Sequence, residues 1–469
     1  MVEAIASSAE DYLIDGLNFK LSPGASYVTN RRNVTWYASG AQQYISGQGA
    51  RVIRIQMNGD GWVDPSTVRL VYTLTNTLGN PFTLRPVGGP WAMFSRVRCM
   101  YGGAICDDIS AYNRTHEMMG ILTSSANRDC DDVSGFGRRW DSREFYPDNF
   151  HRFIGSHQDD PDELGFGGLY PLASQTVSFK PMVGVLCQSK YLPLMWGGFV
   201  MEFEIISDPT EAFADSVEGG NFTPTDTGIG WAMSDVRLVG DVVTLDSALQ
   251  NSYSEHVLSG KSLPINYGTY ITMQQTVVGS EISVNISRAV SRLKTIFCSF
   301  DGVFNPTNAQ KAKYPYYLVK RPFNYFYHPM GKRVSDTAAF GDLIYDFKKE
   351  VEYQVIIGTK MIPEYPCRSL SQAHSELKKA VGILGSPWHS ISPTYRQYWT
   401  DHFIIGIDCE KVLDASWTGL NTKAGDLVTL KLKGANGTID TALMPTKMYI
   451  TLHSDNILEI RDSGASVYD

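Results

Sequence analysis

The sequence predicts an all-β fold made of two tandem jelly-roll sandwiches of eight strands each, with one short helix inserted in each sandwich. Three observations support this prediction. Short strand-like segments recur between turn signals along the chain. Aromatic residues, which suit pleated and half-buried surfaces, are plentiful, with 25 Tyr, 21 Phe and 9 Trp among 469 residues. The same succession of a strand, a kink and a helix occurs twice along the chain.

The first half of the chain contains six strand-like segments. Residues Arg51–Gln56 alternate polar and apolar side chains, and residues Met201–Ile205 do the same. This alternation is typical of a strand with one solvated face. Turn clusters such as Asn58–Gly61 separate the segments. The expected strands are Asn33–Ser39, Arg51–Met57, Val68–Asn76, Phe94–Tyr101, Thr176–Leu186 and Phe199–Ile206.

Residues 207–230 are polar and rich in Gly, which is typical of a linker. We therefore expect an N-terminal arm at residues 1–26, a first jelly roll at 27–208, a linker at 209–230 and a second jelly roll at 231–469. The strand pattern resumes after the linker. The expected strands there are Val236–Thr244, Tyr267–Val278, Ile282–Phe300, Val351–Ile357, His402–Asp408, Leu427–Lys433 and Lys447–Leu452.

The two halves resemble each other around their inserted helices. Tyr101–Ile105 ends a strand and leads through an acidic kink to a helix expected at Ser110–Leu122. Ile357–Ile362 ends a strand in the same way, before a Pro-rich kink and a helix expected at Ser369–Leu384. Each helix holds a His and a Glu near its middle and finishes with Gly-Ile-Leu. The order of elements favours an internal duplication over a coincidence between two short amphipathic helices.

A second similarity relates the last strands of the two halves. Residues Phe199–Asp208 and Met448–Asp455 both follow a Leu-Met pair, at a spacing close to that of the helices. One repeat of roughly 250 residues explains both similarities. In the second helix Ser369 and Gln372 form a capping box. Its expected apolar stripe is Leu370, Ala373, Leu377, Val381 and Leu384, and that of the first helix is Tyr112, Thr115, Met119 and Leu122.

Charge and composition exclude several classes of protein. The formal net charge is −8, and Lys20, Arg31 and Arg32 are the only basic residues among the first 32. A basic arm that wraps nucleic acid is therefore absent from this segment, and we expect no sequence-specific nucleic-acid binding. No apolar run approaches the roughly 20 residues that span a bilayer, so we expect no direct membrane insertion. The seven Cys form no CxxC pair and are expected to be reduced thiols, mostly in the core.

Motifs that would indicate catalysis are incomplete. His116–Gly120 begins like a zinc-binding helix, but Gly120 stands where the second His is needed. Gly260–Ser262 ends like a phosphate-binding loop, but Glu255 stands where its first Gly is needed. No GxSxG occurs. A triad assembled in space stays open, since its members need no fixed spacing. We expect no catalytic residue, no cofactor and no metal site.

Two further regions have an open interpretation. Acidic clusters at Asp129, Asp131 and Asp132 and at residues 159–163 suit solvated loops, with calcium binding as the alternative. Residues Lys311–Arg333 alternate basic and aromatic side chains. Such a stretch can stack on single-stranded nucleic acid, but it equally suits a protein interface or a packed loop, which we favour.

Several of these segments together resemble one family. They are Tyr27–Arg32, Gly59–Arg69, Gly88–Phe94, Asp107–Met118 and, at the end of the chain, Leu452–Ile460. Their order is similar to that of the double jelly-roll major capsid proteins of polinton-like viruses and related double-stranded DNA viruses. The similarity is densest before residue 140. It does not extend to residues 300–345, whose role stays open.

The resemblance implies a homotrimer with two jelly rolls per subunit, which forms a pseudo-hexagonal capsomer of an icosahedral shell. It implies neighbouring capsomers, penton proteins and minor capsid proteins as partners. The location would be the virion, after assembly inside the host cell. The chain would then be a structural protein and not an enzyme. The alternatives are a tandem β-sandwich carbohydrate-binding protein or glycoside hydrolase, and a minor capsid or spike protein.

Overall fold

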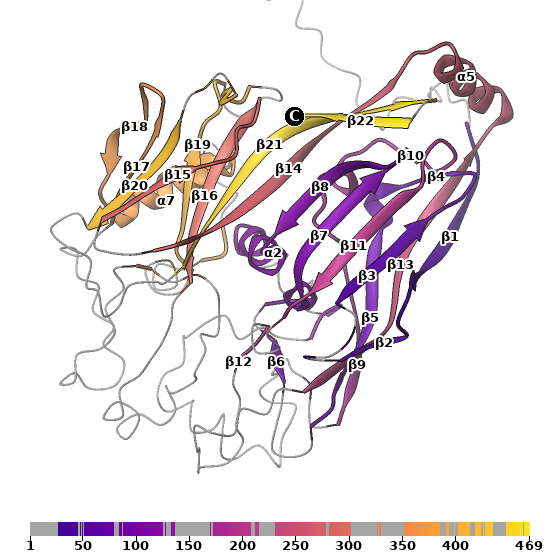
Figure 1. Cartoon of the computed structure of the whole chain (residues 1–469), viewed down its shortest axis with the longest axis horizontal. Coiled ribbons are helices and arrows are strands. Elements are labelled where there is room, and N and C mark those ends of the chain that lie inside the picture. The colour runs from indigo at the N-terminus through magenta and orange to yellow at the C-terminus, as the bar shows by residue number, and fades with distance from the viewer. Residues whose placement is uncertain are drawn as a thin grey trace, which may run out of the picture.

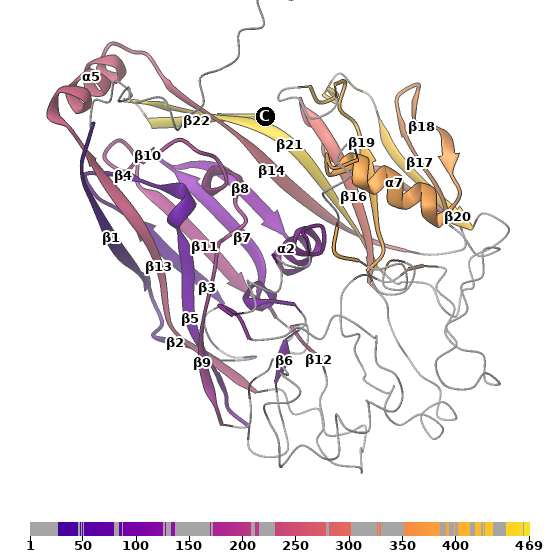
Figure 2. The ribbon, with the colours of Figure 1, turned by 180° about the vertical axis from the view of Figure 1, so that it is seen from behind.

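The computed structural model describes two β-sandwiches that lie next to each other (Figures 1 and 2). The described residues are 27–78, 84–124, 172–207, 230–277, 281–301, 351–384, 402–412, 418–434 and 447–469, apart from single positions within these ranges, together with a few short segments between them. We call the two sandwiches the first and the second jelly roll.

The first jelly roll has eight main strands in two sheets. One sheet has the order β1 (Val28–Ser39), β13 (Trp231–Leu245), β5 (Arg69–Asn76) and β9 (Ser174–Phe179). The other has the order β3 (Val52–Met57), β11 (Phe199–Ile205), β7 (Phe94–Tyr101) and β8 (Ala104–Ser110). The end of β1 also pairs with β3, so the two sheets are joined by hydrogen bonds. The short strands of this half are β2 (Gln43–Ile45), β4 (Trp62–Val63), β6 (Arg85–Pro86), β10 (Leu192–Pro193) and β12 (Phe213–Ala214).

The second jelly roll also has eight main strands. One sheet has the order β14 (Leu263–Thr276), β21 (Lys447–Arg461), β16 (Leu293–Asp301) and β19 (Ile404–Asp408). The other has the order β15 (Glu281–Ile286), β20 (Val428–Gly434), β17 (Val351–Ile357) and β18 (Lys360–Cys367). A short last strand, β22 (Gly464–Tyr468), pairs with the end of β21.

The strand order is the same in both sandwiches. If the eight main strands of each are counted along the chain, one sheet has the order 1-8-3-6 and the other has the order 2-7-4-5, in both cases. Such identity of topology is what a duplicated jelly roll requires. The predicted fold class, two tandem eight-stranded jelly rolls with an inserted helix each, is confirmed.

Strand pairing places the end of the first jelly roll later than the sequence suggested. β13 pairs with β1 and β5 and is therefore the eighth strand of the first jelly roll. The expected division at 209–230 does not follow this pairing, because it puts β13 in the second jelly roll. Within the expected linker, β12 pairs with β6, and Phe213 is buried in the first core. Most of residues 208–229 lie outside the described part of the chain.

The same count of strands corrects the similarity expected between the last strands of the two halves. Residues Phe199–Ile205 form the seventh strand of their jelly roll, whereas Lys447–Arg461 form the eighth. The strand that corresponds to β21 is therefore β13, and β11 corresponds to β20. The expected match between β11 and β21 is wrong. A strand that alternates polar and apolar residues has the same sequence pattern whichever of the two sheets it belongs to.

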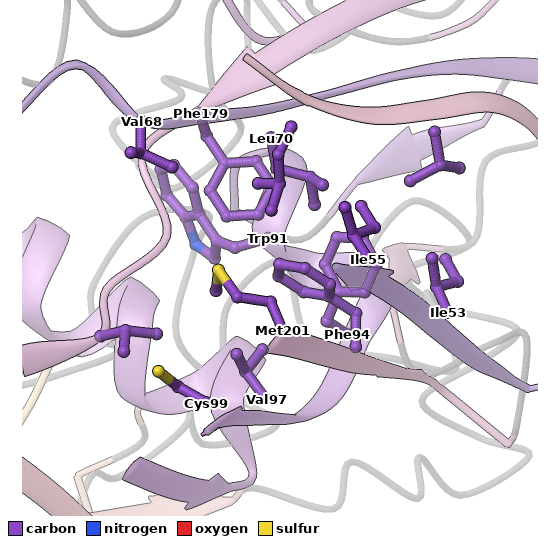
Figure 3. Packing of buried hydrophobic residues seen from close by; sticks show 14 of the residues in the cluster. Ile53, Ile55, Val68, Leu70, Trp91, Phe94, Val97, Cys99, Phe179 and Met201 are labelled. Atoms are coloured by element: carbon purple, nitrogen blue, oxygen red, sulfur yellow. The ribbon is translucent and has the colours of Figure 1, made fainter. Parts of the chain in front are cut away.

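Most expected strands are confirmed, and several have other limits. Thr176–Leu186 is divided, because Pro181 follows β9 and Gly184–Leu186 form a 3-10 turn, η4. Ile282–Phe300 is likewise divided into β15 and β16. β3 alternates exposed and buried residues as predicted. Its side chains Ile53 and Ile55 point into the first core with Leu70, Trp91, Phe94 and Met201 (Figure 3).

Three α-helices occur in the described residues. α2 (Tyr112–Ile121) and α7 (Leu370–Ala380) are the two predicted helices. The Ser369 side chain accepts a hydrogen bond from Gln372 N, as the capping box requires. The third, α5 (Ser247–Leu258), was not predicted, because only Val257 of its residues is buried and no apolar stripe marks it.

Candidate functional site: the junction between the two jelly rolls

The two jelly rolls share one long ribbon of two strands. β14 and β21 pair without interruption from Leu263–Ile460 to Thr276–Lys447. At one end of the ribbon Ile265, Tyr267, Leu458 and Ile460 belong to the core of the first jelly roll. At the other end Met448, Ile450 and Leu452 belong to the core of the second. Figure 1 shows the ribbon running from the second jelly roll over the first. The two sandwiches are therefore packed into one body by a shared element.

A buried carboxyl group lies where the ribbon crosses the first jelly roll. Asp107, on β8, is 2% exposed. It accepts hydrogen bonds from the Thr269 hydroxyl of β14 and, at 3.5 Å, from Val185 N within η4. Next to it, the Tyr267 hydroxyl donates to Cys106 O at 2.8 Å. Burial raises the pKa of Asp107 to about 6, although the hydrogen bonds from Thr269 and Val185 to its carboxylate act to lower this pKa.

Two glycines allow the backbones to approach each other at this crossing. A Cβ atom on Gly184 would lie 2.0 Å from Gly268 O, and one on Gly268 would lie 2.7 Å from Nε2 of His453. Either added carbon would collide with its neighbour, so both positions need Gly. The His453 ring stacks on Tyr270 with 4.8 Å between ring centroids. Burial lowers the pKa of His453 to about 4, so this ring is neutral at pH 7.

Helix α2 makes the second contact of the junction. The Thr115 and Thr272 hydroxyl oxygens are 2.7 Å apart, and those of Thr272 and Thr451 are 3.0 Å apart. The Arg114 guanidinium lies over the Tyr449 ring, 4.6 Å from its centroid, which is a cation–π contact. At the helix end Met118, Ile121 and Leu122 belong to the core of the second jelly roll. A helix of the first jelly roll thus completes the second.

The residues that resemble a zinc helix have structural contacts. The His116 ring stacks on Trp91 at 4.0 Å, and its Nε2 lies 3.3 Å from Lys180 O. The Glu117 carboxylate accepts a hydrogen bond from Trp91 Nε1 at 2.9 Å. Both side chains therefore fix α2 against the first jelly roll. Among the described residues, no group of three or more His, Cys, Asp or Glu is placed to hold a metal ion.

Of the other candidate segments, the structure fully describes only Gly260–Ser262, which follows α5. Gly260 has a φ of 82° and ends α5, with its N–H donating to Val257 O, so Gly260–Ser262 is a helix terminus. The acidic residues 129–132 and 159–163 lie outside the described part of the chain, as does most of Lys311–Arg333.

Five of the six described Cys are buried, as predicted, and Cys187 is exposed. In the described residues, no helix is long and apolar enough to cross a bilayer.

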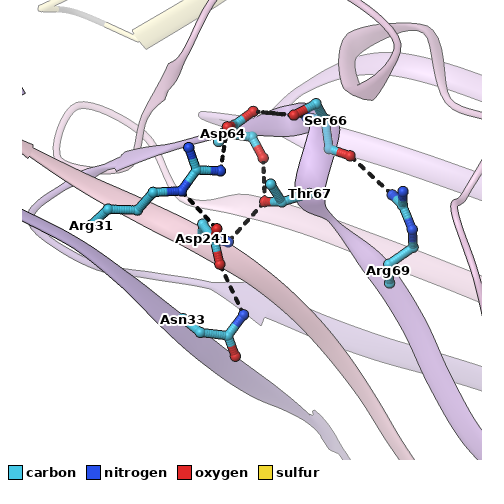
Figure 4. A network of polar contacts seen from close by, with 7 residues as sticks. All are labelled: Arg31, Asn33, Asp64, Ser66, Thr67, Arg69 and Asp241. Carbon is cyan, nitrogen blue, oxygen red and sulfur yellow. Dashed lines mark hydrogen bonds and ion pairs between the residues drawn. The ribbon is translucent and has the colours of Figure 1, made fainter.

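Ion pairs cover the outer faces of the first jelly roll. Nε and Nη2 of Arg96 each donate a hydrogen bond of 2.6 Å to the Asp108 carboxylate, and Arg98 bridges Asp108 and Glu202 at 3.5 Å each. A second network ties β1 to its neighbours (Figure 4). There Arg31 binds Asp64 at 2.8 Å and Asp241 at 2.7 Å. Individual exposed pairs of this kind contribute little stability.

The comparisons with known proteins concern the fold. No family model matches the sequence, and no curated protein matches it. Solved structures do match. A chain of the Sputnik virophage structure has a TM-score of 0.58 and 8% identity, and the match covers 98% of this chain and 92% of that one. A chain of the PBCV-1 virus capsid has a TM-score of 0.54 and 13% identity, with 96% and 99% covered. The Faustovirus major capsid protein has a TM-score of 0.53 and 9% identity, with 98% and 94% covered.

These matches define the class of fold. The chain has the double jelly-roll fold of viral major capsid proteins, over nearly its whole length. The resemblance found in the sequence is confirmed at this level. The residues that form the junction come from β8, α2, η4, β14 and β21, which are far apart in the sequence. No local pattern therefore indicated the junction. The one available signal was the pattern of β21, whose apolar alternation continues to Ile460, well beyond the expected end at Leu452.

Proposed function

We propose that this chain is a structural major capsid protein that forms trimeric, pseudo-hexagonal capsomers in the icosahedral shell of a DNA virus. The observation that supports this proposal is the fold of two jelly rolls with the same strand order, because this fold is similar to viral capsid structures over more than nine-tenths of the chain. The proposed role is structural and not enzymatic.

The geometry of the junction suits this role. Three copies of a chain with two similar jelly rolls present six similar sides, so one gene product can occupy a hexagonal lattice with nearly equivalent contacts. That requires the two jelly rolls of one chain to keep a fixed orientation. The β14–β21 ribbon and helix α2 supply such a constraint, because each contributes residues to the second core while being attached to the first.

The proposal includes the partners and the location. Neighbouring capsomers, penton proteins and minor capsid proteins would contact the trimer, and the protein would be found in the virion after assembly inside the host cell. The net charge of −8 agrees with contacts to protein and not to the phosphates of a genome.

The purified chain tests the proposal directly. Light scattering after size exclusion is expected to give about 156 kDa, three times the 52.1 kDa of one chain, or larger shells. Electron microscopy of the same fractions is expected to show hexagonal capsomers or closed particles. A monomer that persists at high protein concentration, without particles, would contradict a role as the major capsid protein.

The matches to viral capsid structures do not favour the carbohydrate-binding alternative. Of the aromatic residues that suggested it, Trp36, Trp62, Trp91 and Trp231 are buried, with at most 8% of each residue exposed, whereas Tyr37 and Tyr365 are exposed.

A further inference from the structure

A buried polar layer separates the two cores on one face of the shared ribbon. Residues two apart in a strand point to the same face. On this face β21 carries Ser454, which is 1% exposed, and Asn456, which is 7% exposed. The face is apolar on both sides of them, with Met448, Ile450 and Leu452 in the second core and Leu458 and Ile460 in the first. Two polar side chains thus interrupt a buried apolar face.

Strand pairing places these two side chains beside the carboxyl group of Asp107. Thr269 lies directly opposite Ser454, and Tyr267 lies directly opposite Asn456. Such opposite residues share a face, with Cβ atoms about 4.5–5.5 Å apart. The Thr269 hydroxyl donates to the Asp107 carboxylate, and the Tyr267 hydroxyl donates to the backbone of β8 at 2.8 Å. Since the ribbon crosses β8 here (Figures 1 and 2), Ser454 and Asn456 face the same strand as their opposite residues.

Two oxygen atoms of this layer lack a hydrogen-bond partner. Ser454 Oγ and Asn456 Oδ1 are buried, and neither has a partner in the described part of the chain. A buried polar atom without a protein partner is unfavourable and normally indicates a bound water or ion. The amide oxygen Oδ1 has no proton to donate, so it needs a hydrogen-bond donor or a cation.

The carboxylate of Asp107 lacks a positive partner. The hydrogen bonds that favour its ionised form come from the Thr269 hydroxyl and from the backbone of Gly184 and Val185, and no Lys or Arg of the described ranges contributes. All these donors are neutral, so the negative charge of the buried carboxylate is not compensated. The layer therefore offers oxygen ligands together with a single negative charge.

We propose that this layer binds one monovalent metal cation, Na⁺ or K⁺, through the Asp107 carboxylate, Ser454 Oγ and Asn456 Oδ1. Hard cations prefer oxygen ligands, and one positive charge neutralises the one carboxylate. A Ca²⁺ site usually has several carboxylates, whereas the described residues contain no group of three or more His, Cys, Asp or Glu placed to hold a metal. The ligands come from β8 and from the ribbon, so the bound cation strengthens the junction between the two jelly rolls.

Thermal unfolding of the full wild-type chain at pH 7.5 tests whether a cation binds. Na⁺ or K⁺ replaces choline stepwise at constant ionic strength, because choline is too large for a buried site. One of the two metal ions is expected to raise the melting temperature by about 2 °C in a saturable way, as binding to the folded state alone requires. The same melting temperature in all three chloride salts would show that only water bridges these oxygens, and the cation site would be wrong.

Two variants that keep Asp107 locate the effect. Asn456→Leu has a similar shape without the ligand oxygen and is expected to abolish the rise in melting temperature, and Ser454→Ala, the smaller change, is expected to reduce it. Thr272→Val is the matched control, because it removes a buried hydroxyl from the opposite face of β14 and is expected to keep the rise. An undiminished rise in both Asn456→Leu and Ser454→Ala would overturn the assigned ligands.

A crystal structure of the wild-type chain in the favoured salt identifies the ion without any variant. Rb⁺ substitutes for K⁺ and is expected to give an anomalous peak next to Asp107, whereas Na⁺ is recognised by more oxygen neighbours than the four that a water molecule can have. Four or fewer neighbours without an anomalous peak would identify a water and contradict the proposal. These measurements need only the folded chain, so they succeed or fail independently of the proposed capsid role.

Discussion

Asp107 is the residue whose chemistry depends most on the junction. It is an acidic side chain on a strand with one buried face, and its carboxyl group ends between two jelly rolls instead of in water. Hydrogen bonds from Thr269 and Val185 compensate part of the lost hydration. The remaining desolvation favours the protonated form, which explains the pKa of about 6.

The raised pKa makes the stability depend on pH in a defined direction. The folded state binds the proton of Asp107 more tightly than the unfolded state does, whose pKa is near 3.8. The free energy of unfolding is therefore expected to fall as pH rises from about 4 to about 6, by about 3 kcal/mol from this group alone. Asp107→Asn keeps the shape without the charge and is expected to remove this dependence.

Urea unfolding of wild type and Asp107→Asn at several pH values checks the expectation. The variant is expected to gain stability relative to the wild type at pH 7.5, and the gain should disappear near pH 4. Asp60→Asn, at an exposed carboxylate of the same jelly roll, is the control and should show no such difference. A constant difference between wild type and Asp107→Asn at all pH values would contradict the proposed cause.

At the level of elements, the two inserted helices differ in their surroundings. α7 lies against one sheet and has the predicted stripe, with Leu370, Ala373 and Leu377 buried, but Leu384 lies beyond the helix and is 49% exposed. α2 is buried on most of its surface, because both jelly rolls cover it. Its predicted stripe was therefore too narrow: Arg114 and Glu117 are buried as well. Amphipathic periodicity describes a helix with one neighbour, not a helix between two.

Leu377 is the central contact of α7. It is fully buried, and a Cβ on Gly406 of β19 would lie 2.7 Å from its Cδ1. Leu377→Asp is expected to reduce the free energy of unfolding by about 3 kcal/mol or more, because it buries an unpaired charge, and to prevent soluble trimer. Denaturant unfolding and the yield of trimer measure both effects. Ser375→Asp adds the same charge on the exposed side of α7 and should change little, while a normal trimer yield for Leu377→Asp would refute the packing assigned to the helix.

At the scale of the whole molecule, the shared ribbon couples the two cores. β14 and β21 form part of both, so neither jelly roll can unfold without breaking strand pairs that the other needs. We expect one cooperative transition for the described body of the chain instead of one for each jelly roll.

A cavity in one core tests this coupling. Leu430→Ala, at a fully buried residue of β20 in the second core, is expected to cost about 2–5 kcal/mol. Scanning calorimetry should show the whole transition moving to lower temperature. Two separate peaks, of which only one moves, would show that the jelly rolls unfold independently. Ile53→Ala in the first core should move the same single transition.

Local periodicity in the amino-acid sequence was sufficient for the all-β class, for the alternation of β3 and for both inserted helices. These features depend on neighbours within a few residues, and a single pattern of polar and apolar side chains records them. The repeat was visible for the same reason, since each copy keeps its own strand, kink and helix.

The placement of β13 in the first jelly roll, the ribbon that spans both cores and the buried Asp107 came only from the folded chain. Each depends on a partner far away in the sequence: Asn33 and Asp241, for example, are 208 residues apart and share a hydrogen bond. The pattern of polar and apolar residues in a strand indicates which face of the strand is buried, but not which strand pairs with it. The pairing depends on how all the strands pack together.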